Sequence, residues 1–330
     1  MKILKKILLS LAFPALMFLV MLAITASSEK CYVNGHFIFI GKDLINQVLM
    51  NSCMTICVAL AIWMQLKNGR FDFSGGASMV LAAIAAGYVG KNTGSMWAAF
   101  GTALVMGLLL CMLTALVYII GRVPIIITTI GMTLLYESLT YILFGGEGVR
   151  AFYSNPKLCA LGRVPGIFLP VGIAMAVFVI YTYFTASGRR AKILANNQSA
   201  GVNIGIDERK NTFVSYVFTG IIIGMAAIIY ISQNDVTPQS GLSTSSILFS
   251  YIVPVFMGTF IGLASNDVIG IAIAAVGMEI MNYGLNCLNL GSGGWQQIIM
   301  GVFVLCFYTF SSQSYKINAF LNGLKRKKTA

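Results

Sequence analysis

The sequence predicts an all-α polytopic membrane protein, and three observations support this prediction. Hydrophobic residues make up 58% of the 330-residue chain and charged residues only 10%, which leaves too little polar surface for a soluble core of this size. Apolar stretches of about 20 residues, long enough to cross a bilayer, recur along the chain. The basic residues lie in short blocks between these stretches, so the net charge of +12 reflects membrane topology and does not indicate nucleic-acid binding.

Ten apolar stretches meet the length rule, so we expect about ten transmembrane helices. They cover residues 7–26, 44–65, 73–90, 96–120, 124–144, 166–186, 212–232, 245–263, 268–288 and 295–311. The first stretch follows Lys2, Lys5 and Lys6 and is longer than a signal-peptide core. We therefore favour a retained first helix, with cleavage near the small residues at 23–28 as the alternative.

The distribution of lysine and arginine predicts that both termini are cytoplasmic. With the N-terminus inside, 16 of the 22 basic residues fall in cytoplasmic segments and six fall outside. Residues 1–330 then form one transmembrane domain in the cell membrane, with a cytoplasmic loop at 187–211 and a basic cytoplasmic tail at 312–330. The tail ends in KRKKTA, a sequence that also favours contact with anionic membrane lipid.

The loop at 187–211 is the longest polar segment between two apolar stretches. It carries five basic and two acidic residues, and its AKILANNQSA sequence favours a helix. We expect a short helix along the membrane face on which a soluble partner docks. The alternative is a solvated positive loop that only sets topology.

Two segments rich in glycine and serine interrupt the apolar pattern. Residues 68–78, NGRFDFSGGAS, open the third stretch from inside, and residues 238–246, PQSGLSTSS, open the eighth from outside. Such residues permit a half-helix whose free N–H groups face a cavity. Spans two to five and seven to ten would then form an inverted repeat.

Two acidic residues, Glu137 and Glu279, fall near the middle of apolar stretches that contain no basic residue. An unpaired charge at mid-bilayer costs about 2.5–3.5 kcal/mol on insertion scales, so both should face a polar interior or be protonated. Helical spacing predicts three polar stripes. These are Thr133, Glu137, Thr140 and Tyr141; Glu279, Asn282, Tyr283 and Asn286; and Gln47, Asn51 and Thr55. They would line a path for an uncharged polyhydroxylated solute or, alternatively, hold the helices together.

No catalytic or metal site is predicted. The nearest approach to a phosphate-binding loop, AAGYVGKN, has Ala85 in place of the first glycine and Asn92 in place of the magnesium-binding hydroxyl, so ATP binding by this chain is not expected. His36 is the only histidine. Most cysteines fall in apolar stretches, and a bridge between Cys31 and Cys159 in the outer loops stays open.

Several motifs together carry a resemblance. NGRFDFSGGAS resembles a G-G-I-D-L-S-V-G-S signature, in register at Gly69, Asp72, Ser74 and Gly76. RVPIIITTIGM resembles V-P-x-F-I-x-T-L-G, and NYGLNCLNLGSGGWQQIIMG resembles N-G-L-N-L-L followed by W-Q-x-x-x-K-G. These signatures belong to the membrane permease of bacterial ABC sugar importers of the ribose, galactose and xylose type, which the chain resembles over nearly its whole length.

The polar loop adds a fourth match, to the family's N-x-x-A-A-x-x-x-G-I segment, through Asn197, Ala200, Gly205 and Ile206. The resemblance implies that this loop couples the permease to the ATPase. It also implies the partners: two ABC ATPase subunits that bind ATP and magnesium, a second permease copy or paralogue, and an extracytoplasmic solute-binding protein. This chain would itself hold no cofactor.

For the translocation path we expect the side chains of Asn51, Asp72, Ser74, Glu137, Asn282 and Asn286. The chain departs from the family pattern at GLASND (262–267), at Met300 and at Arg70. These departures make a heterodimer with a paralogue an alternative to a homodimer. The rival function is an ion-coupled secondary transporter that uses Glu137 and Glu279 as titrating groups.

Overall fold

The computed structural model describes residues 2–33, 36–262, 265–291, 294–299, 301–302 and 305. Two short strands of two residues each, β1 (Tyr32–Val33) and β2 (His36–Phe37), pair antiparallel. The other regular elements of these residues are helical. The first half contains α1 (Lys2–Ala26), η1 (Glu29–Cys31), α2 (Lys42–Leu66), α3 (Ser74–Thr93), α4 (Met96–Gly121), α5 (Ile125–Ile142) and η2 (Leu143–Gly146). The second contains η3 (Ala160–Gly162), α6 (Phe168–Val179), η4 (Ile180–Phe184), α7 (Ala186–Asn196), α8 (Gln198–Asn203), α9 (Glu208–Gln233), α10 (Ser243–Gly262) and α11 (Asp267–Cys287).

The structure confirms an all-helical chain with six or seven candidate spans among the described residues, and the predicted total of about ten stays a prediction. Among the described residues, six helices are long and apolar enough to cross a membrane: α2, α4, α5, α9, α10 and α11. A seventh is reached if α6–η4 and α7, bent by 75° at Thr185, count as one span. Helix α3 lies at the predicted position but is rich in glycine, alanine and serine, which lowers its hydropathy. Most of the tenth predicted stretch and the whole basic tail lie outside the described residues.

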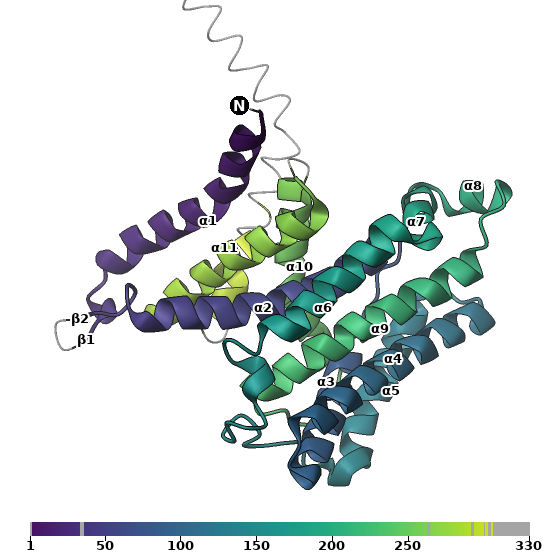
Figure 1. Cartoon of the computed structure of the whole chain (residues 1–330), viewed down its shortest axis with the longest axis horizontal. Helices are drawn as coiled ribbons and strands as arrows, with labels where there is room; N and C mark the ends of the chain where they lie inside the picture. Colours follow the sequence, from purple (N-terminus) through teal and green to yellow (C-terminus); the bar gives the residue numbers. More distant parts are fainter. Residues whose placement is uncertain are drawn as a thin grey trace, which may run out of the picture.

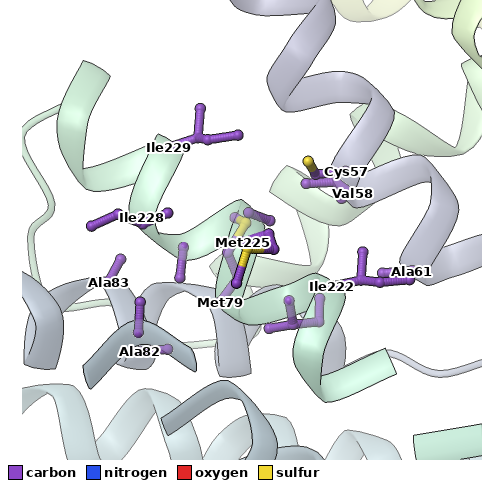
Figure 2. Packing of buried hydrophobic residues seen from close by; sticks show 14 of the residues in the cluster. Cys57, Val58, Ala61, Met79, Ala82, Ala83, Ile222, Met225, Ile228 and Ile229 are labelled. Atoms are coloured by element: carbon purple, nitrogen blue, oxygen red, sulfur yellow. The ribbon is translucent and has the colours of Figure 1, made fainter. Parts of the chain in front are cut away.

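Helix α9 is the centre of the larger bundle. It is the most buried candidate span, with 72% of its apolar window covered, and it packs against α2, α3, α4 and α6 (Figure 1). Figure 2 shows the interior of this bundle, where Met79 of α3 and Met225 of α9 fill the space beside α2. Unbranched thioether side chains adapt to irregular gaps between helices.

Glycines allow α9 to contact α4 directly. A Cβ atom added at Gly107 of α4 would lie 2.7 Å from the carbonyl oxygen of Gly220, and one added at Gly224 would lie 2.7 Å from the Cα atom of Leu104. Small residues at such crossings bring helix backbones together in membranes, where apolar burial between helices gains little. The glycine pattern therefore determines which face of α4 meets α9.

A second apolar cluster joins α1, α10 and α11, and α2 lies between the two groups of helices (Figure 1). Loop contacts pair segments that are predicted to lie on the same side. Lys67 forms an ion pair with Asp267 at 2.8 Å, and the Cys31 thiol lies 3.6 Å from the carbonyl oxygen of Cys287. Which face is cytoplasmic stays a prediction. Cys31 and Cys159 are both free thiols, so the structure does not contain the bridge left open by the sequence.

Candidate functional site

A cavity of about 870 Å³ lies between α2, α9, α10 and α11 and reaches the connection between η2 and α6. Its wall combines amides, hydroxyls and aromatic rings with one carboxylate and one guanidinium. The polar lining residues are Asn51, Thr55, Arg163, Ser232, Gln233, Asn234, Ser246, Ser250, Glu279, Asn282, Gln296 and Gln297. The aromatic ones are Tyr153, Tyr230, Phe249 and Tyr251. This wall suits a polar solute with an apolar face, since amides and hydroxyls bond its polar groups and rings pack against its carbon skeleton.

Glu279 is the buried carboxylate of this cavity, with 8% of its surface exposed. One of its oxygens accepts a hydrogen bond from the Thr55 hydroxyl at 2.6 Å, and the other accepts from the Asn282 amide at 3.4 Å. The Asn282 carbonyl accepts in turn from Gln296 at 3.2 Å. Four polar side chains from α2, α11 and the segment after α11 are therefore held in one network at the cavity wall.

The structure divides the predicted path residues into two groups. Asn51 and Asn282 line the cavity, together with Thr55 and Glu279 of the same predicted stripes. The remaining path residues do not line it. They are Asp72, Ser74, Glu137 and Asn286. Helical spacing identified the stripes on α2 and α11 but could not show which end of each stripe faces the cavity.

Asp72 and Glu137 instead cap the two helices that the glycine-serine segments open. One Asp72 oxygen accepts from the backbone N–H and the hydroxyl of Ser74, both at 2.7 Å, at the start of α3. Glu137 accepts from the backbone N–H groups of Leu242 and Thr244 at 2.8 Å, and from the Thr244 hydroxyl at 2.6 Å, at the start of α10. Carboxylates at these positions accept hydrogen bonds from free N–H groups. Their negative charge also interacts favourably with the positive end of the helix dipole.

These two helix starts also contact each other. Gly76 of α3 packs directly on the backbone carbonyl of Thr244 in α10, with no room for a side chain between them. The segments 68–78 and 238–246 therefore meet inside the bundle, each with an acidic cap. Whether they are copies of an inverted repeat stays a prediction.

Sequence reasoning missed the part of the cavity formed by α9 and α10. Tyr230, Gln233 and Asn234 line it from the end of α9, and Phe249 and Tyr251 line it from α10. The spacing of the α9 residues, i, i+3 and i+4, is the same signal that marked the other stripes. The α10 aromatics carry no such signal, because they are hydrophobic residues in an apolar helix.

The predicted short helix in the loop 187–211 is present as two pieces, α7 and α8, set at an angle to the bundle (Figure 1). The Thr185 hydroxyl accepts from the N–H of Gly188 at 3.0 Å and starts α7. The Asn197 side chain accepts from the N–H of Ala200 at 3.0 Å and starts α8. Of the predicted coupling residues, Asn197 thus stands between the two helices and Ala200 lies in the first turn of α8.

The other two predicted coupling residues follow α8, in the segment that leads to α9. Gly205 has a φ of +87°, and no atom of the described residues lies within 4 Å of where a Cβ atom would be, so this position faces open space. Ile206 is buried beneath it, whereas its neighbour Ile204 is 69% exposed. Val202 and Ile193 are also exposed apolar side chains on α8 and α7. The loop 187–211 therefore exposes apolar side chains and also carries five basic residues.

Comparison with known proteins assigns the family. A family model described as branched-chain amino acid transport system / permease component matches residues 44–308, which is most of the chain. The chain belongs to this permease family. As an importer permease it is a multi-pass bacterial membrane protein and is not itself catalytic. No cluster of three or more His, Cys, Asp or Glu side chains that could hold a metal ion occurs in the part of the chain that the structure describes.

Several curated members of the permease family are similar over much of their length. The ribose import permease protein RbsC of Escherichia coli strain K12 is 28% identical over 300 residues, which cover 88% of this chain and 89% of RbsC. The autoinducer 2 import system permease protein LsrD of Photorhabdus temperata is 27% identical over 258 residues, covering 74% of this chain and 77% of LsrD. No solved structure matches the chain.

Proposed function

We propose that this permease passes a sugar or similar polar solute into the cytoplasm through the cavity between α2, α9, α10 and α11. The observation that supports this most directly is the cavity wall itself. It presents uncharged hydrogen-bonding groups and aromatic rings, with the Arg163 guanidinium and a single carboxylate that is already bonded to Thr55 and Asn282. Two relatives, the ribose and autoinducer 2 permeases, are named for small polar solutes, in agreement with this chemistry.

The permease would work with separate subunits that supply the solute and the energy. An extracytoplasmic binding protein would deliver the solute to the outer side, and two ATPase subunits that bind ATP and magnesium would dock on α7 and α8. A second permease, either a copy of this chain or a paralogue, would complete the membrane part. The exposed Ile193, Val202 and Ile204 are the apolar groups that such an ATPase would cover.

Replacing Asn282 with Ala is expected to reduce uptake about 10-fold, because the change removes a cavity amide and one hydrogen bond to Glu279, about 1–1.5 kcal/mol of polar interaction. The same change at Asn51 should also reduce uptake, since Asn51 lines the cavity. The measurement is uptake by whole cells of a panel of labelled pentoses and hexoses, using whichever sugar the unmodified transporter accumulates.

Asn286→Ala is the matched control. It removes the same amide from the same helix, but Asn286 is exposed and does not line the cavity. We expect uptake to stay within about twofold of the unmodified transporter, as for a surface substitution. Equal loss of uptake in the Asn282 and Asn286 variants would contradict the assignment of the cavity as the path.

A further inference from the structure

Arg70 is a buried arginine, and no acidic group of the described residues lies within 4 Å of its guanidinium. The sequence places it among the cytoplasmic basic residues, yet only 5% of its surface is exposed. Lys67, three residues earlier in the chain, does have such a partner, since it forms an ion pair with Asp267. Burying a guanidinium is costly unless hydrogen bonds compensate for its lost hydration, so its partners must account for its position.

Three neutral side chains supply those hydrogen bonds. The guanidinium donates to the Thr212 hydroxyl at 2.8 Å, to the Ser215 hydroxyl at 2.5 Å and to the Gln65 carbonyl at 3.3 Å. Gln65 donates onward to Thr219 at 2.8 Å. Arg70 therefore links the connection between α2 and α3 to the first turns of α9, the helix that follows the cytoplasmic loop directly.

Asn68 makes a second link in the same connection. Its side-chain carbonyl accepts from the Tyr181 hydroxyl of η4 at 3.0 Å and from the Asn211 amide of α9 at 2.9 Å. All three side chains are buried. Because η4 precedes α7 and α9 follows α8, Asn68 is bonded to both segments that flank the proposed ATPase-docking loop.

The connection also contacts the loop and the cavity helices. A Cβ atom at Gly69 would lie 2.9 Å from the Cα atom of Ala195 in α7, so the backbone of the connection rests directly on that helix. Two residues after Arg70, Asp72 caps α3, and Gly76 of α3 packs on the start of α10, which lines the cavity. A continuous series of contacts thus runs from α7 through residues 68–76 to α10.

We propose that Arg70 and Asn68 are positioning residues that transmit movement of α7–α8 to the cavity wall. This inference rests on the proposed function, in which α7–α8 receives the movement of the ATPase. The planar guanidinium holds three partners in fixed directions, which a compact ammonium group or an apolar side chain cannot do. The two hydrogen-bonded links make the connection move with η4 and α9, and the acidic cap passes this movement to α3 and α10.

The test uses the full transporter, reconstituted with its ATPase and binding protein, and a cysteine at Ser250 as a reporter. Ser250 is exposed in the cavity. Its labelling by a membrane-impermeant maleimide is measured in the nucleotide-free state and after trapping with vanadate. We expect the two rates to differ about 10-fold with native Arg70, and less than about twofold with Arg70→Met, while ATP hydrolysis continues.

Lys67→Met is the matched control, since it removes a basic residue from the same connection without touching the Arg70 and Asn68 bonds. It should keep the full difference in labelling. Arg70→Lys, which keeps the charge but not the fork of donors, should lose most of the difference, and Asn68→Ala should behave in the same way.

A full labelling difference in Arg70→Met would overturn the proposal. So would failure of both Arg70→Met and Arg70→Lys to assemble with the ATPase, because that result would assign Arg70 to folding alone. A different result would contradict the proposed function itself. In that case the labelling of the Ser250 reporter would not depend on nucleotide even in the transporter with native Arg70.

Discussion

Replacing Gly205 with Arg is expected to abolish uptake while the protein still inserts normally into the membrane. Gly205 lies at the exposed turn after α8, where no atom of the described residues comes within 4 Å of the position a Cβ atom would take. An arginine there would not disturb the interior, but it would occupy the space in which an ATPase surface has to fit. The φ of +87° adds local strain of about 1–2 kcal/mol for a residue with a side chain. We expect uptake to fall at least about 100-fold.

Gly94→Arg separates the docking effect from the backbone effect. Gly94 also has a positive φ, +63°, and also faces open space, but it lies at the end of α3, away from the loop 187–211. Uptake and the surface amount of each variant are measured together, with uptake expressed per inserted molecule. Similar uptake in the Gly205 and Gly94 variants would refute the coupling role of the turn.

Replacing Glu137 with Ala is expected to destabilise the whole bundle. The change leaves the N–H groups of Leu242 and Thr244 and the Thr244 hydroxyl without their acceptor in a buried site. Each unsatisfied buried group costs about 1–3 kcal/mol, so the total loss is on the order of 3 kcal/mol or more. In detergent, the midpoint of thermal unfolding should fall on the order of 10 °C, and less protein should reach the membrane.

Glu147→Ala provides the comparison, because Glu147 is an exposed carboxylate shortly after α5. Its unfolding midpoint should stay within about 2 °C of the unmodified protein. A Glu137→Ala protein with normal stability and lost uptake would assign this carboxylate to the solute path. It would contradict the capping role that its three hydrogen bonds indicate.

The sequence predicts most of the helix positions because long apolar stretches have few alternatives in a membrane. It also marks the polar stripes of α2 and α11, which contribute Asn51, Thr55, Glu279 and Asn282 to one cavity. In these cases the side-chain period of the helix is enough. The number of spans does not follow from the apolar pattern alone, because α3 is helical but only weakly apolar.

Other features depend on contacts between distant segments, which periodicity does not encode. Glu137 looks the same as Glu279 in the sequence, yet it caps α10 while Glu279 lines the cavity. Arg70 looks like a topology signal because it is basic and follows an apolar stretch. Its burial depends on hydroxyls at Thr212 and Ser215, more than 140 residues away. Only the tertiary arrangement distinguishes these roles.

The most direct test of the proposed importer function is to purify the tagged chain in mild detergent and identify its partners by mass spectrometry. An ABC ATPase should copurify with it, together with a second permease if the membrane part is a heterodimer. The Gly205→Arg variant should lose the ATPase. Recovery of the unmodified chain alone, even after crosslinking in the membrane, would contradict the account and favour an ion-coupled carrier that uses Glu137 and Glu279.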